Sequence, residues 1–142
     1  MADLTRKSWI PVAVIIGATY AFVGVVFALP AAHAQIWRLA AWAVSAVAYG
    51  AHIRYERLRP GNSHRRVALH VALAAALGAF GLAISANIHA LHIGTSTNHR
   101  LLLALSLAIW PLITAAPAFC IAFVASWALT CVLRSRNDTR TH

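Results

Sequence analysis

Acidic side chains are nearly absent from this sequence of 142 residues. Only Asp3, Glu56 and Asp138 occur against twelve Lys and Arg residues, and charged residues together make up 11% of the chain. Soluble domains carry about 25% charged residues, so this chain has too few to cover a globule in water. The sequence also has no carboxylate pair within an apolar segment, no dithiol motif and no phosphate-binding glycine loop. We therefore do not expect an enzyme.

Cysteine is equally scarce. Cys120 and Cys131 lie eleven residues apart in one apolar segment, which places them about 16 Å apart along a helix. A disulfide needs Cα atoms within about 7 Å, so these two cannot pair inside that helix. We interpret both as small apolar packing residues.

Long apolar blocks are what the sequence does contain, and 61% of its residues are hydrophobic. A transmembrane helix needs about 20 mostly apolar residues to cross about 30 Å of hydrocarbon. Short polar connections separate the blocks, so consecutive helices should be antiparallel neighbours. The blocks cover residues 10–29, 36–55, 67–93 and 101–133. We predict an all-α integral membrane protein, folded as a single four-helix up-down bundle.

The fourth block is too long for one straight span. Its 33 residues would form a helix of about 50 Å, which tilting alone does not accommodate. Pro111 and Pro117 each remove a backbone donor and clash one turn back. We predict a kink between Trp110 and Ala118, with one end of the block projecting beyond the hydrocarbon.

Basic residues are distributed unevenly between the two sides of this topology. Ten of the twelve fall on the side of the termini and the second connection, whereas Arg38 and Arg100 fall on the other side. The positive-inside rule then places both termini in the cytoplasm, and the Ala- and Arg-rich composition favours a bacterial inner membrane. Because the basic residues lie between apolar blocks, we interpret them as topological and expect no nucleic-acid partner.

A signal peptide is the alternative for the first block. Arg6 and Lys7 precede it, and Ala32-His33-Ala34 follows it, which fits a signal-peptidase site. Cleavage after Ala34 would leave three spans. The apolar stretch exceeds the 7–15 residues typical of signal peptides, so we expect four retained spans.

One face of the second helix is unusually polar. Its members recur every three or four residues and fall within an arc of about 80°. Charged groups at mid-membrane depth cost at least about 2.5–3.5 kcal/mol each, so this face should contact protein. We name it the polar stripe: Arg38, Trp42, Ser45, Tyr49, His52 and Glu56.

The third helix carries a matching face of His70, Gly78, Gly81 and Ser85. Small residues let helices approach closely in lipid. We therefore predict that the second and third helices form the tightest pair, with Glu56 at the cytoplasmic edge. The leading hypothesis is a non-enzymatic membrane protein whose polar residues support packing or association with a copy of itself or another membrane protein.

Three other hypotheses remain open. A b-type haem protein would use His52 and His70 as axial ligands. A small oligomeric transporter or channel would need a histidine relay, because no carboxylate is expected at membrane depth. A metal site on the outer side would use His89 and His92 with His33 or His99.

The second connection is rich in arginine. Juxtamembrane basic residues gain about 1 kcal/mol each near an anionic leaflet. We expect anionic lipid headgroups to bind here, at Arg54, Arg57, Arg59, Arg65 and Arg66.

Overall fold

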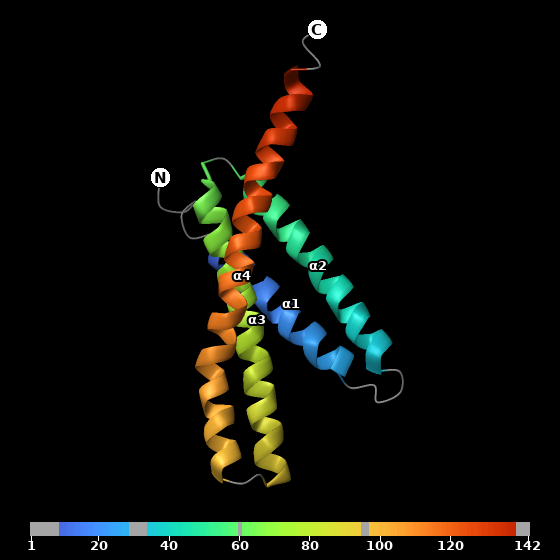
Figure 1. The fold of residues 1–142 in the computed structure, drawn as a ribbon, viewed down its shortest axis with the longest axis vertical. Helices are drawn as coiled ribbons and strands as arrows, with labels where there is room; N and C mark the ends of the chain where they lie inside the picture. Colours follow the sequence, from blue (N-terminus) through green and yellow to red (C-terminus); the bar gives the residue numbers. More distant parts are fainter. Residues whose placement is uncertain (1–8, 29–33, 60, 95–96, 139–142) are drawn as a thin grey trace.

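The computed structural model describes residues 9–28, 34–59, 61–94 and 97–138. This part of the chain forms four α-helices and contains no strand, which confirms the all-α prediction. The helices are α1 (Trp9–Ala28), α2 (Ala34–Leu58), α3 (His64–Ile93) and α4 (Thr97–Asp138). Figure 1 shows α3 and α4 as a long antiparallel pair, with α1 crossing α3 and α2 diverging from both.

Three of the four helices are long and apolar enough to cross a membrane. They are α1, α3 and residues 99–132 of α4. The remaining helix, α2, does not reach that apolarity, because Arg38 and the rest of the polar stripe interrupt its Ala, Val and Leu residues. The sequence thus identified three candidate spans that the structure supports and a fourth that is more polar.

Both ends of α3 are defined by its local sequence. Ser63 is the N-cap, and its hydroxyl accepts a hydrogen bond from the backbone N–H of Arg66. Gly94 ends the helix in the left-handed conformation, at φ 69°, which glycine adopts without a steric penalty.

The first connection contains most of the possible cleavage motif, and residues 29–33 lie outside the described part of the chain.

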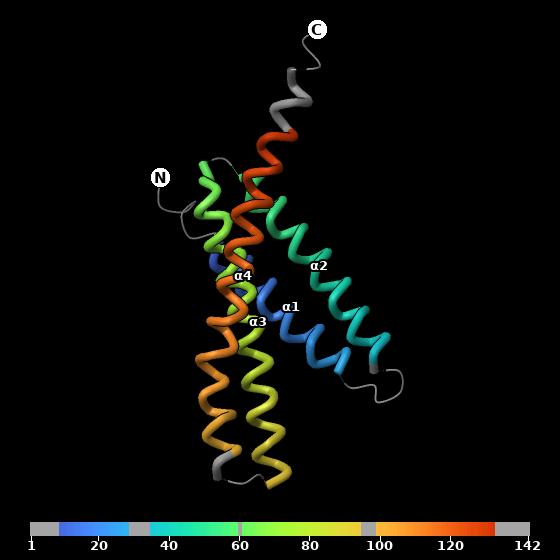
Figure 2. The backbone as a smooth tube through the Cα atoms, viewed as in Figure 1, coloured from blue at the N-terminus to red at the C-terminus, as the bar shows by residue number. Residues whose placement is uncertain are grey.

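The two prolines of α4 do not end the helix. Pro111 and Pro117 both lie inside it, and Figure 2 shows the helix changing direction near its middle. A proline removes one backbone hydrogen bond and pushes the preceding turn away, so a bend is the expected response. Both prolines lie within α4, and the bend near its middle is the response that the sequence predicted.

The small face of α3 packs on α1, and its predicted pairing with α2 is wrong. A Cβ atom added at Gly78 would lie 2.6 Å from Tyr20 Cβ and 3.2 Å from the carbonyl oxygen of Gly17. One added at Gly81 would lie 2.8 Å from Ala21 Cβ. The reason is shape, because α1 offers small residues of its own, whereas the stripe of α2 carries bulky side chains that prevent so close an approach.

The prediction that α2 and α3 form the tightest pair is also wrong. The most extensive contact is between α3 and α4, followed by that between α1 and α3. One bridge between α3 and α4 is Asn87, whose side-chain amide donates to the carbonyl oxygens of Ala83, at 2.8 Å, and Leu103, at 2.9 Å. Contacts of α2 with α3 and α4 are few and involve Tyr49 and Ile53, which pack on a core of Val67, Val71, Ala122 and neighbouring residues. The C-terminal part of α2 is thus attached to the α3–α4 pair.

Replacing Gly78 with alanine should destabilise the protein by about 1–3 kcal/mol, because the added methyl group overpacks the contact with Tyr20 and Gly17. The matched control is Gly50→Ala, since Gly50 has no neighbour within 4 Å of an added Cβ; it should leave stability unchanged or raise it slightly. Unfolding in mixed micelles with increasing SDS measures both. Equal effects of the two changes would contradict the α1–α3 contact.

Candidate functional site

The most unusual feature of the structure is the position of Glu56. Its side chain is fully buried, with 0% of its surface exposed. We predicted this residue at the cytoplasmic edge, and the structure shows in addition that α2, α3 and the second connection enclose it. A buried carboxylate is costly unless it is paired and hydrogen-bonded, so the partners of Glu56 define the candidate site.

One oxygen of Glu56 receives two hydrogen bonds. His70 Nδ1 lies 2.8 Å from Glu56 Oε2, and Asn62 Nδ2 lies 3.0 Å from the same oxygen. Because an ionised carboxylate only accepts, Nδ1 of His70 is the protonated nitrogen. Asn62 also donates to the backbone carbonyl of Glu56 at 2.9 Å. The second connection is therefore tied to the end of α2 through this amide.

The other oxygen of Glu56 is less well satisfied. Within the described residues Oε1 accepts no hydrogen bond, and the nearest cation is Arg59 Nη1 at 3.9 Å. Arg59 also donates to the hydroxyl of Tyr55 at 2.9 Å and lies 4.9 Å from the centre of that ring. This arginine partly neutralises the carboxylate from the solvent side.

A tryptophan from a third helix covers His70. The rings of Trp9 and His70 are 4.4 Å apart at an interplanar angle of 3°, a stacked arrangement. The stacked indole covers one face of the imidazole, so Trp9 holds the His70 ring in the orientation in which Nδ1 reaches Glu56. Side chains from α1, α2, α3 and the second connection thus converge on one carboxylate.

His52 adds a second titratable group one helical turn before Glu56. Only 2% of its surface is exposed, and neither ring nitrogen has a hydrogen-bond partner among the described residues. Its neighbour Ile53 is part of the apolar core that α2 shares with α3 and α4. A buried imidazole without a partner is destabilising as it stands, and a charged one would be more so.

Polar contacts to α4 surround this centre. Arg57 donates to the hydroxyl of Thr130 at 2.7 Å and to the carbonyl oxygen of Asn62 at 3.0 Å. His64 Nδ1 lies 3.0 Å from the hydroxyl of Ser126, and the Tyr49 hydroxyl donates to the carbonyl oxygen of Ala118.

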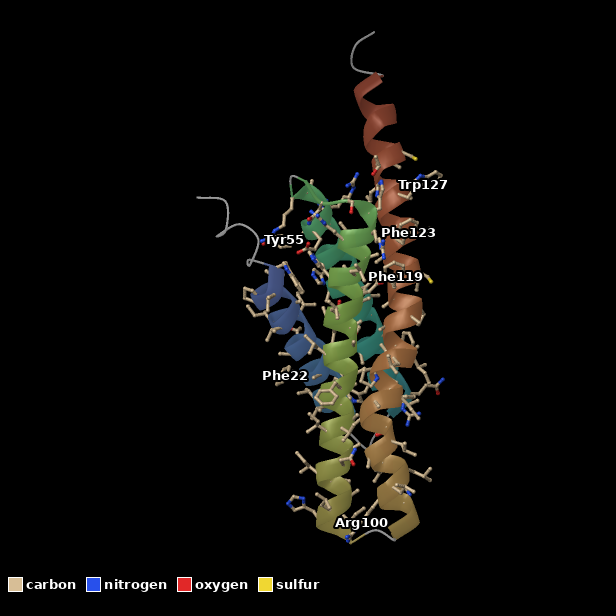
Figure 3. All side chains as sticks on the ribbon, turned by 90° about the vertical axis from the view of Figure 1, so that its left-hand side faces the viewer. Phe22, Tyr55, Arg100, Phe119, Phe123 and Trp127 are labelled. Carbon is tan, nitrogen blue, oxygen red and sulfur yellow. The ribbon has the colours of Figure 1, made fainter. Side chains whose placement is uncertain are left out.

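We call Glu56, His52, His70, Arg59 and Asn62 the Glu56 cluster. Figure 3 shows its end of the molecule, near Tyr55, opposite to Arg100.

The other half of the polar stripe is not part of this site. Arg38 is exposed, Ser45 is half-buried, and Trp42 has 79% of its surface exposed. Divergence of α2 from α3 and α4 leaves these residues away from the predicted partners Gly78, Gly81 and Ser85. The predicted stripe is therefore divided into a buried C-terminal half and an exposed N-terminal half.

The predicted outer metal site has little support from the geometry. His89 and His92 are exposed, and His92 donates from Nδ1 to the carbonyl oxygen of Ile88 at 2.8 Å. His33 lies outside the described residues. Across the residues that the structure describes, no three side chains of His, Cys, Asp or Glu are arranged to hold a metal ion.

Haem fits His52 and His70 poorly. A porphyrin extends in every direction perpendicular to the bond between iron and imidazole nitrogen. The stacked ring of Trp9 occupies one of these directions next to His70, and His52 lies buried beside the Ile53 core. Space for the macrocycle would require displacement of Trp9 and repacking around His52. We therefore assign no haem chemistry to this pair.

Several residues of the site were not found by sequence pattern. Trp9 resembles an interfacial anchor, and Asn62 lies in a Pro-Gly-Asn-Ser turn motif, so neither indicates a partner for a carboxylate. Ser126 and Thr130 are spaced by four on α4, which is a usable signal, because it places two hydroxyls on one helix face.

Comparison with known proteins gave no relatives. No family model matches the chain, and searches of curated proteins and of solved structures returned no match.

Glu56→Gln should destabilise the protein by about 2 kcal/mol or more, because it weakens charge-assisted hydrogen bonds in a buried setting. His70→Phe keeps the ring that stacks on Trp9 but removes the donor. A double-mutant cycle with these two changes should give a coupling energy of at least about 1 kcal/mol.

The same unfolding assay in mixed micelles measures each variant. Arg54→Gln is the matched control on the same helix, because Arg54 is exposed, and it should change stability by less than about 0.5 kcal/mol. Additive effects of Glu56→Gln and His70→Phe would show that the pair contributes nothing to stability.

Proposed function

We propose that this chain is a membrane-embedded association module that binds a second copy of itself through the exposed half of α2. The observation that carries this proposal is the exposure of Arg38 and Trp42 on a stripe whose other half is buried. Both residues are exposed near the N-terminal end of α2, where a neighbouring helix that covers the Trp42 indole and contacts the Arg38 guanidinium is favoured. The module lies in a bacterial inner membrane with both termini in the cytoplasm, as the uneven distribution of basic residues supports.

A second copy supplies a suitable partner for Arg38. The carboxylate of Glu56 is already enclosed by His70 and Asn62, so it is not free to pair with an arginine on another chain. An indole face is the next best partner for a guanidinium. Trp42 lies one helical turn from Arg38 on the same stripe, so a two-fold arrangement lets Arg38 of each copy cover Trp42 of the other.

Trp42→Ala should weaken self-association about tenfold or more, because a cation–π contact contributes about 0.5–2 kcal/mol and a two-fold dimer makes it twice. Val47→Ala is the matched control, since Val47 is 74% exposed on the opposite face of α2. Energy transfer between differently labelled copies in lipid vesicles, at several protein-to-lipid ratios, measures association. A monomer at every ratio, or an equal effect of Val47→Ala, would contradict the proposal.

We also propose that anionic lipid headgroups bind at the arginine-rich end. Arg57 and Arg59 are engaged within the chain, whereas Arg54, Arg65 and Arg66 are exposed. Arg65 and Arg66 lie in the first turn of α3, which contains no acidic residue. The partial positive charge of a helix N-terminus adds to theirs in attracting phosphate. Of the five arginines predicted to bind headgroups, we therefore propose that Arg54, Arg65 and Arg66 do so.

Arg65→Gln and Arg66→Gln together should lower affinity for phosphatidylglycerol by at least about fivefold, because each basic residue contributes about 1 kcal/mol near an anionic surface. Arg57→Gln should leave that affinity unchanged and lower stability instead, since Arg57 joins α2 to Thr130. Native mass spectrometry of bound lipids, with phosphatidylcholine as reference, distinguishes the two. Equal lipid loss in all variants would argue against the assignment.

A further inference from the structure

We infer that the Glu56 cluster contains an internal water site, in which a bound water molecule bridges the His52 imidazole and the Oε1 atom of Glu56. This inference does not depend on self-association, because both groups that hold the water belong to one helix of one chain.

Unpartnered polar atoms are concentrated in one turn of α2. Among the described residues, three of the four buried side-chain nitrogen and oxygen atoms without a hydrogen-bond partner belong to His52 and Glu56. The fourth is the hydroxyl of Tyr20 on α1. A buried polar atom is normally hydrogen-bonded, either to protein or to an ordered water. Because His52 is 2% exposed and Glu56 is 0% exposed, three such atoms in one turn indicate a bound ligand.

Helical spacing brings these atoms together. Residues four apart are neighbours on one face of a helix, so the His52 ring lies beside the side chain of Glu56. The two side chains are not bonded to each other, and Oε2 of Glu56 is already engaged by His70 and Asn62. Polar groups that are neighbours without a direct bond are the usual partners of a bridging water.

The charges around Oε1 favour a neutral ligand. Arg59 Nη1 lies 3.9 Å from this oxygen, so a metal ion or an ammonium group bound there would be repelled by the guanidinium. An anion would be repelled by the carboxylate itself. The ligand also has to match His52, whose neutral ring has one donor and one acceptor. Water both donates and accepts, so it fits whichever ring nitrogen carries the proton, and a second water can bind the other nitrogen.

Solvent lies close to this site. The side chains of Arg59 and His70 both approach Glu56, and they are 27% and 15% exposed. The buried carboxylate is therefore separated from solvent by single side chains. A buried water commonly makes about three hydrogen bonds, and Oε1, His52 and a second water supply that number.

Transfer of magnetisation from water protons to individual carbons tests this by solid-state NMR of the isotope-labelled chain in lipid bilayers, at about pH 8, where histidine is neutral. We expect transfer to the ring carbons of His52 to be at least about threefold faster than transfer to the side chain of Ile53. Ile53 is the matched reference, because it is the next residue, is 4% exposed and belongs to the apolar core. Equal rates at His52 and Ile53 would overturn the inference, as would transfer to His52 from lipid headgroup protons in place of water.

A variant tests the bridge itself. His52→Leu replaces the imidazole with an apolar group, so transfer from water to the carboxylate carbon of Glu56 should fall at least about twofold. Arg54→Gln, at an exposed position on the same helix, should leave that transfer unchanged.

The chemical shift of His70 Nδ1, which lies 2.8 Å from Glu56 Oε2, reports whether the His52→Leu chain keeps its fold. Undiminished transfer to Glu56 in the folded variant would show that His52 does not share the water, and the inference would be wrong. If His52→Leu does not fold, the comparison of His52 with Ile53 in the unaltered chain decides alone.

Discussion

The structure depends on satisfying one buried carboxylate. A charge removed from water has to recover the lost solvation from hydrogen bonds and nearby opposite charges, and Glu56 finds these in His70, Asn62 and Arg59. His70 belongs to α3, whereas Arg59 and Asn62 belong to the second connection, so meeting this requirement fixes how α2, α3 and the second connection are joined. Trp9 brings α1 to the same point by stacking on His70.

A concentrated attachment explains the shape of the molecule. Two kinds of contact hold the helices, and they act in different places. Close approach between small residues joins α1 to α3 along the helix faces, as at Gly17 and Gly78, and such contacts favour a long common interface. Polar contacts join α2 to α3 at one end only. Toward its other end α2 contacts α1 instead, where Trp37 meets Phe27, so it diverges from α3 and α4, as Figure 1 shows.

The helical class, the three candidate spans and the proline bend could all be predicted from the sequence. Each follows from properties that belong to one segment: block length, mean apolarity or the missing N–H of Pro111 and Pro117. The pairing of helices could not. Small residues on α3 suit any partner that is itself small, and the sequence offered both α1 and α2. Choosing α1 requires comparing side-chain bulk across two helices, with Trp42 and Tyr49 on one side and Gly17 and Ala21 on the other.

For a similar reason, the sequence predicted that the histidines of the candidate site lie together but did not predict that Glu56 is buried. The helical spacing of His52 and Glu56 placed both on one face, and the short connection brought His70 within reach, so the histidines were found together. Burial of Glu56 was not found, because position near the end of an apolar block indicates depth along the helix axis and not enclosure by other segments. Asn62 and Trp9 complete that enclosure, and neither carries a charge that would point to a carboxylate.

The position of the single carboxylate among the arginines also reconciles two requirements on the same end of the molecule. Topology favours positive charge there, yet several guanidinium groups close together repel one another. Enclosing Glu56 next to Arg59, with Arg57 drawn aside to Thr130, removes part of that repulsion from the helix junction. Arg54, Arg65 and Arg66 stay exposed, so the end remains basic toward the membrane surface. Had the carboxylate been exposed instead, it would have cancelled part of the surface charge and left the junction without a counterion.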